Sequence, residues 1–79
     1  MGYVFEKVKV NAYKLRAYDR VELDSPAFRG KRIATVQKIE YRNGDGNGPW
    51  ITFATRDGGA LPPNQYCSSD YFRRVKRNY

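Results

Sequence analysis

The sequence predicts an all-β fold, a small barrel of five to six strands in a single domain. Three observations predict it. Val, Ile, Thr and aromatic residues gather in short runs, as they do in strands. Gly, Asn, Asp, Ser and Pro separate these runs, most densely at residues 42–49. With 79 residues and 41% hydrophobic residues, the chain can build one small core and no more.

The first eighteen residues predict a strand or an ordered arm that packs on the barrel. Val4, Val8 and Val10 fall on one face of an extended segment, because side chains alternate along a strand. Residues 11–12 form a candidate bend, and residues 13–18 then alternate basic with aromatic or aliphatic residues. Residues 1–18 are therefore expected to form the N-terminal strand or arm, and residues 19–79 the barrel with a short basic tail.

Residues 19–41 are expected to organise the barrel. A short strand at 20–23 directs Val21 and Leu23 inward, and a turn-rich loop follows at 24–31. Phe28 in that loop is a candidate core residue. A long strand then runs from 32 to 41.

The long strand departs from simple alternation. Ile33 and Ile39 are in phase with each other, whereas Ala34 and Val36 fall on the opposite face. A bent strand with a β-bulge reconciles the two sets, and small barrels need such bends.

The remaining elements follow from turn signals. Residues 42–49 predict a hairpin loop, because Asn-Gly and Asp-Gly are hairpin dipeptides. A strand at 50–56 directs Ile51 and Phe53 to one face, and residues 57–59 form a tight turn. Pro62-Pro63 restricts residues 60–66 to a short edge strand or an extended loop, because proline cannot donate to a ladder.

The C-terminal part predicts one helical turn and a closing strand. The side chains of residues 68–70 can cap a single helical turn. The last strand is expected at 71–75, with Phe72 and Val75 buried.

This order of elements resembles an SH3-like barrel. Residues 19–23, 28–31 and 33–36 look like the KOW-type opening of ribosomal and transcription-factor barrels, although Tyr18 and Arg32 replace two glycines of that motif. Residues 67–75 are similar to the closing segment of plasmid-type dihydrofolate reductase barrels. The Val-Gln-Ile-Tyr signature of those enzymes is Asn-Gln-Tyr-Cys here, at residues 64–67. The resemblance therefore implies a fold and no reductase activity.

Composition excludes the common catalytic designs. The chain has no histidine and one cysteine, Cys67, which is expected to be a half-buried residue at the barrel edge. Triad chemistry, an internal disulfide and a His/Cys metal site are excluded, so we expect no enzyme activity, no cofactor and no metal. The single thiol and the absence of a long apolar run favour a cytoplasmic protein without a membrane partner.

The net charge of +7 favours a polyanionic partner, with DNA or RNA as the first candidate. The basic C-terminus is expected to join Lys14, Arg16 and Arg20, because the first and last strands of a barrel are close. The alternative is a solvated surface balanced by Glu22, Glu40 and Asp70. The candidate nucleic-acid-binding residues are Arg29, Lys31, Arg32, Lys38, Arg42, Trp50, Arg73, Arg74, Lys76 and Arg77.

A second hypothesis is an adaptor or inhibitor of viral or accessory type that binds an acidic protein. Its contact face would contain Trp50, Tyr66 and Tyr41, with the basic residues steering association. We expect Tyr41 and Tyr71 to fill or cover the core instead, and leave Trp50 open between stacking and packing. The chain is expected to be a monomer or a small homo-oligomer.

Overall fold

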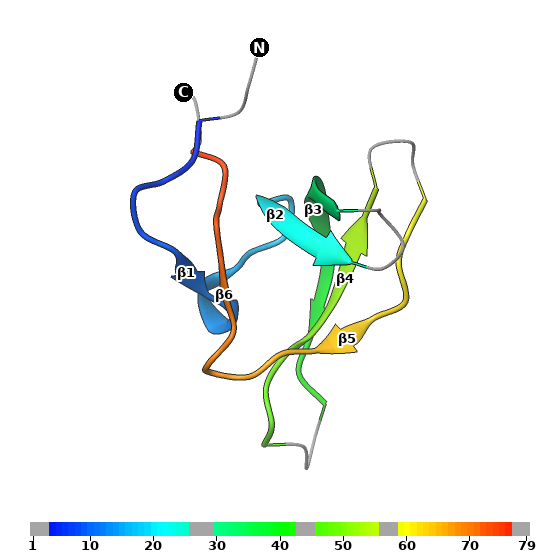
Figure 1. Cartoon of the computed structure of the whole chain (residues 1–79). Helices are drawn as coiled ribbons and strands as arrows, with labels where there is room; N and C mark the ends of the chain where they lie inside the picture. Colours follow the sequence, from blue (N-terminus) through cyan, green and yellow to red (C-terminus); the bar gives the residue numbers. More distant parts are fainter. Residues whose placement is uncertain (1–3, 26–29, 43–45, 56–58, 77–79) are drawn as a thin grey trace.

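The computed structural model describes residues 4–25, 30–42, 46–55 and 59–76. Its strands form two antiparallel sheets, which confirms the all-β prediction (Figure 1). The larger sheet has the strand order β2-β3-β4-β5, and β1 pairs with β6 in the smaller one. The strands are β1 (Val10–Asn11), β2 (Arg20–Ser25), β3 (Gly30–Glu40), β4 (Trp50–Ala54), β5 (Asn64–Gln65) and β6 (Tyr71–Phe72).

The two sheets do not close into a barrel, which corrects the expected architecture. An isolated bridge between Val21 and Arg74 links β2 to the C-terminal segment. The N–H of Val75 also donates to the carbonyl of Arg20 at 2.8 Å. The first strand of the predicted barrel and the last segment are therefore adjacent, as expected. At the opposite edge of the larger sheet from β2, β5 is only two residues long. It follows Pro62-Pro63, which lack the N–H groups needed to extend a ladder.

The hairpin of β2 and β3 is longer than predicted. Its register runs from Arg20 opposite Thr35 to Ser25 opposite Gly30, so both strands extend into the stretch assigned to the loop. Val21 is 0% exposed and Leu23 is 8% exposed, which confirms their inward orientation. Phe28 lies outside the described residues.

The predicted bulge is present in β3. The register with β4 shifts between Val36 and Lys38. Val36 lies directly opposite Phe53, and Ile39 lies directly opposite Ile51, so all four side chains share one face of the sheet. The extra residue therefore brings Ile39 onto the core face together with Val36, although the two are three positions apart.

The β4 strand alternates as predicted. Ile51 and Phe53 are buried, whereas Trp50, Thr52 and Ala54 are half-buried on the other face. Ile51 and Phe53 therefore supply the core side of this strand.

The helical turn lies in a different place from the one expected. The segment before β6 is a turn in which the N–H of Asp70 donates to the carbonyl of Cys67 at 3.0 Å, and the Asp70 carboxylate accepts from the N–H of Cys67 at 2.7 Å. A 3-10 turn, η1 (Ala12–Lys14), forms instead in the N-terminal segment. The Asn11 side chain caps it by accepting from the N–H of Tyr13 at 2.9 Å. Cys67 is exposed, so the prediction that it is half-buried is wrong.

The N-terminal segment runs beside the C-terminal one (Figure 1). Val10 pairs with Phe72, and Phe5 forms a bridge with Val75. The N–H of Lys76 donates to the carbonyl of Val4 at 2.7 Å. Phe72 and Val75 are 8% and 7% exposed, which confirms that both are buried.

A cluster of three aromatic rings closes one side of the core. The ring centroids of Phe53, Tyr66 and Phe72 lie 5.3–5.9 Å apart in edge-on or tilted arrangements. Such pairs stabilise a fold by about 0.5–1.5 kcal/mol beyond the burial of their area. The buried hydrophobic core contains Ala12, Leu15, Val21, Leu23, Ala34, Val36, Ile51, Phe53, Phe72 and Val75.

Candidate nucleic-acid interface

Lys38 and Arg42 share one carboxylate at the end of the β3–β4 hairpin. The Lys38 Nζ lies 3.3 Å from Glu40, and the Arg42 Nε lies 3.2 Å from the same carboxylate. The Arg42 guanidinium also stacks over the Trp50 ring at 4.0 Å from its centroid. The hydrogen bond from Arg42, followed by that from Lys38, lowers the pKa of Glu40 below its ordinary value. These predicted residues therefore form one cluster whose charge Glu40 partly balances.

Arg73 is paired with an acidic residue of β2. Its Nη1 lies 3.4 Å from the Glu22 carboxylate, and its guanidinium lies 4.1 Å from the centroid of the Phe5 ring. The Arg73 side chain remains 47% exposed, so it is accessible to a partner.

Arg74 is engaged at each of its three guanidinium nitrogens. Two of them donate to Glu6, at 2.9 and 3.1 Å, and the third donates to Asp19 at 3.2 Å. The Asp19 side chain is fully buried and also accepts from the N–H of Arg16 at 3.0 Å. The hydrogen bonds that Arg74 donates to Glu6 and to Asp19 raise its pKa despite its partial burial. Arg74 thus connects the N-terminal segment to the start of β2.

Other predicted basic residues lie elsewhere. Arg32 and Lys76 are exposed. The Lys31 backbone belongs to β3, and its side chain lies outside the description. Arg29 and Arg77 lie outside the described residues.

The acidic residues expected to balance the surface have two different roles. Glu22 and Glu40 form the predicted ion pairs with basic side chains. The Asp70 carboxylate instead accepts from the backbone of Cys67. Much of the predicted basic set is therefore matched by acidic groups, among which Glu6 and Asp19 were not anticipated.

Two tyrosines expected to fill or cover the core are exposed. Tyr41 is 60% exposed because it follows the end of β3. Among the described residues, its ring pairs only with that of Tyr13, edge-on, with the ring centroids 6.4 Å apart. Tyr71 is 57% exposed because it alternates with the buried Phe72 in β6. Tyr66 is half-buried in the aromatic cluster, and this burial raises the pKa of its hydroxyl.

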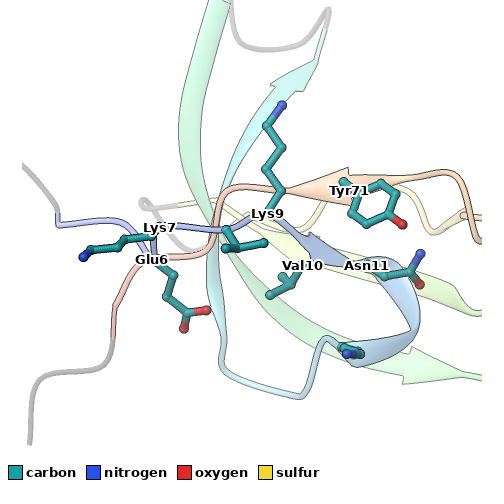
Figure 2. A pocket seen from close by; sticks show the side chains of 8 residues that line it. Glu6, Lys7, Lys9, Val10, Asn11 and Tyr71 are labelled. Carbon is teal, nitrogen blue, oxygen red and sulfur yellow. The ribbon is translucent and has the colours of Figure 1, made fainter.

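Sequence reasoning named Lys14 beside the C-terminal bases but missed two further lysines of the N-terminal segment, Lys7 and Lys9. Lys7, Lys9 and Lys14 line an open depression of about 610 Å³, with Tyr71 on the neighbouring strand (Figure 2). Within the part of the chain that the structure describes, none of the three takes part in an ion pair. The signal was the Lys-x-Lys spacing at positions 7 and 9 of an extended segment. We name Lys7, Lys9 and Lys14 the lysine cluster.

Two further depressions adjoin the first. One, of about 430 Å³, is lined by Arg16, Lys76, Arg74 and Glu6, and Glu6 also lines the first. The other, of about 310 Å³, shares Lys9 and Tyr71 with the first. The C-terminal bases Arg74 and Lys76 thus lie beside Arg16, as expected. Lys14 lines the adjoining 610 Å³ depression.

The arrangement offers cationic groups and aromatic faces, and the described residues contain no group of three potential metal ligands. The Cys67 thiol lies 2.9 Å from the Ser69 hydroxyl on the surface. No helix in the described ranges is long and apolar enough to cross a membrane. What the surface can do must be inferred from these side chains, because no protein-family model matches the chain and neither a curated protein nor a solved structure shows significant similarity to it.

Proposed function

We propose that this protein is a non-catalytic module that binds nucleic acid through phosphate contacts, with weak sequence preference. The observation that carries the proposal is the lysine cluster, Lys7, Lys9 and Lys14, gathered around one open depression. In a chain of net charge +7, these three lysines have no ion pair among the described residues and line the same depression as the exposed Tyr71 ring.

The availability of these lysines matters for affinity. A cation that contacts phosphate releases condensed counterions, and this release provides most of the non-specific binding energy. Arg74 already donates to two carboxylates, so phosphate would have to compete with Glu6 and Asp19 for it. The lysine cluster, with Arg16 and Lys76 in the adjoining depression, faces no such competition from the described side chains.

Weak sequence preference follows from the elements that carry the bases. Reading base edges in the major groove requires a helix or a two-stranded ribbon that enters it. The lysine cluster lies on residues 7–14, outside the β2–β3 and β3–β4 hairpins, beside the β1–β6 pair, whose strands are two residues long. The helical structure among the described residues is the three-residue η1. Phosphate and stacking contacts are therefore the interactions that this surface supports.

The SH3-like relationship is part of the same proposal. The pairing of β2 with the C-terminal segment, together with the bent β3, supports it. A cytoplasmic location is also proposed, since an exposed free thiol at Cys67 suits a reducing compartment.

The test is fluorescence anisotropy with labelled DNA and RNA across a salt series. The variant Lys7→Gln/Lys9→Gln/Lys14→Gln should lower affinity and reduce the slope of log affinity against log salt by roughly 2 to 3, at 0.7–0.9 per phosphate contact. The control, Lys38→Gln/Arg42→Gln, removes two charges that Glu40 already pairs and that lie outside the three depressions, so it should reduce the slope less for each charge removed. A wild-type protein that binds neither nucleic acid at low salt would refute the proposal.

A second candidate is a protein-binding role at the end of the β3–β4 hairpin. Two features favour it: the exposed pair of Tyr13 and Tyr41, and the stacking of Arg42 on Trp50. Tyr and Arg are enriched in protein interfaces, and the nearby bases would steer an acidic partner. A pull-down that survives nuclease treatment and is lost in Trp50→Ala supports this candidate, whereas retention by Trp50→Ala argues against it.

A further inference from the structure

The surface around β6 carries a more specific inference, which rests on the proposed function. We propose that the ligand is single-stranded nucleic acid, and that one unpaired base stacks on the ring of Tyr71 while neighbouring phosphates contact the lysine cluster. The site would recognise the unpaired base and the phosphates that single-stranded DNA and RNA have in common.

The Tyr71 ring is held by ordered backbone and presented to solvent. Tyr71 pairs with Asn11 across the small sheet, and its neighbour Phe72 is buried in the core. The hydrogen-bonded turn between Cys67 and Asp70 leads directly into it. Strand alternation then directs the Tyr71 side chain outward, where it is 57% exposed. A flat ring with a fixed backbone loses little freedom when a base stacks on it.

Tyr71 lies where cationic groups surround an open surface. It lines the 610 Å³ depression shown in Figure 2 and also the 310 Å³ depression, and Lys9 lines both as well. Lys7 and Lys14 line the first depression, and Arg73 lines the second. Glu22, which pairs with Arg73, and Asp70 also line the second depression and offset its bases. A strand that crosses Tyr71 would therefore find its excess of positive charge on the side of the first depression.

The other exposed rings lack this setting. Tyr13, Tyr18 and Tyr41 line none of the three depressions described above. Trp50 is half-buried, and the Arg42 guanidinium lies 4.0 Å from its ring centroid. Tyr71 is the exposed ring that the lysine cluster adjoins, so base stacking is assigned to it.

The same chemistry favours a single strand over a duplex. In a duplex the base faces are covered by their neighbours, and stacking on a protein ring requires the cost of opening the pair. Single-strand binders combine a basic groove with aromatic rings on which bases stack, and every base has a suitable face. The combination of Tyr71 with the lysine cluster matches this arrangement and predicts little dependence on sequence.

The experiment compares labelled oligonucleotides of about 10 nucleotides, within the range of single-strand site sizes. Three forms are used: single-stranded DNA, single-stranded RNA, and the DNA duplex of the same sequence. The single strands should bind more tightly than the duplex, and the ratio of DNA to RNA affinity identifies the preferred ligand. Tyr71→Ala should weaken single-strand binding roughly ten- to hundredfold, the effect of losing one stacked base. Tyr71→Phe keeps the ring and should bind like the wild type.

The control is Tyr41→Ala, which removes an equally exposed tyrosine away from the depressions and should retain binding. The salt slope of Tyr71→Ala should stay at the wild-type value, because the substitution removes no phosphate contact. Equal affinity for single strand and duplex, or equal effects of Tyr71→Ala and Tyr41→Ala, overturns this inference. The proposed function fails separately, when the lysine variants leave the affinity and its salt slope unchanged.

Discussion

The Arg74 guanidinium and the Glu6 carboxylate form a two-point ion pair. The Arg74 Nε donates to one Glu6 oxygen at 2.9 Å, and its Nη2 donates to the other at 3.1 Å. The two residues are 68 positions apart in the chain. The remaining nitrogen donates to the buried Asp19, which precedes β2. The Arg74 side chain therefore links the C-terminal segment to the N-terminal segment and to the start of the first strand of the larger sheet.

Arg74→Met should lower the free energy of unfolding by about 3 kcal/mol, the lower end of the range for breaking a buried ion pair. The reason is that the fully buried Asp19 carboxylate loses its charged partner. Chemical denaturation followed by circular dichroism measures the change.

Lys76→Met is the matched control for this prediction. Lys76 lines the same depression as Arg74 but is exposed, so its removal should change stability by no more than about 0.5 kcal/mol. Equal effects of the two substitutions would mean that the network around Arg74 contributes nothing to stability.

Tyr66 predicts a loss of stability at alkaline pH. Burial raises the pKa of its hydroxyl above the ordinary value of 10.0, so the folded protein favours the neutral phenol. This contribution is complete below pH 10.0 and is lost as the pH rises toward the raised pKa. Tyr66→Phe lacks the ionisable group and should lose less stability than the wild type between about pH 9 and about pH 11.

Thermal unfolding at those two pH values tests this prediction. Tyr41→Phe removes an exposed hydroxyl, and its pH dependence should follow that of the wild type. If Tyr66→Phe also follows the wild type, the buried phenol is not the cause of the alkaline loss.

The Glu40 carboxylate predicts the direction of its response to two substitutions. Its pKa lies below the ordinary value of 4.5, with the hydrogen bond from Arg42 as the largest cause, followed by the hydrogen bond from Lys38 and the charge of Lys38. Arg42→Met and Lys38→Met should therefore each raise the titration midpoint of Glu40. A pH titration of side-chain carboxyl resonances by NMR measures both shifts, and an unchanged midpoint in either variant would contradict the assigned geometry.

Local alternation explains what could be predicted from the sequence. The burial of Val21 and Leu23 and the bulge that realigns Ile39 with Val36 follow from neighbours within one strand or hairpin. These features depend on a few consecutive residues, so a single sequence contains the necessary information.

Long-range partners explain what could not be predicted. Nothing in the sequence places Glu6 beside Arg74, and that pairing determines which bases are engaged and which remain available. The pairing of Asn11 with Tyr71, which places the N-terminal segment beside β6, is likewise a contact between distant parts of the chain. The candidate site therefore lies at the N-terminal lysines, whereas Arg74 among the predicted C-terminal bases is engaged by two carboxylates.

Gly48 and Gly46 give the sharpest stability test, because they lie in the same loop and meet opposite surroundings. Gly48 has a φ of 122°, and a Cβ there would overlap the Tyr66 carbonyl oxygen and lie 3.1 Å from the Tyr13 hydroxyl. A Cβ at Gly46 would meet nothing within 4 Å. Gly48→Ala should therefore lower the free energy of unfolding by about 2 kcal/mol or more, since left-handed strain alone costs of order 1–3 kcal/mol.

Gly46→Ala should leave stability unchanged or raise it by up to about 1 kcal/mol, because it only restricts the unfolded chain. The Gly48 carbonyl also accepts from the Gln65 side chain at 3.1 Å, and the N–H of Tyr66 donates to Pro49 at 3.0 Å. A shift of the backbone at Gly48 would thus disturb the contact between the hairpin and β5 as well as the position of Tyr66. Denaturant titrations of both variants measure the difference, and equal stabilities would show that this close approach does not constrain the fold.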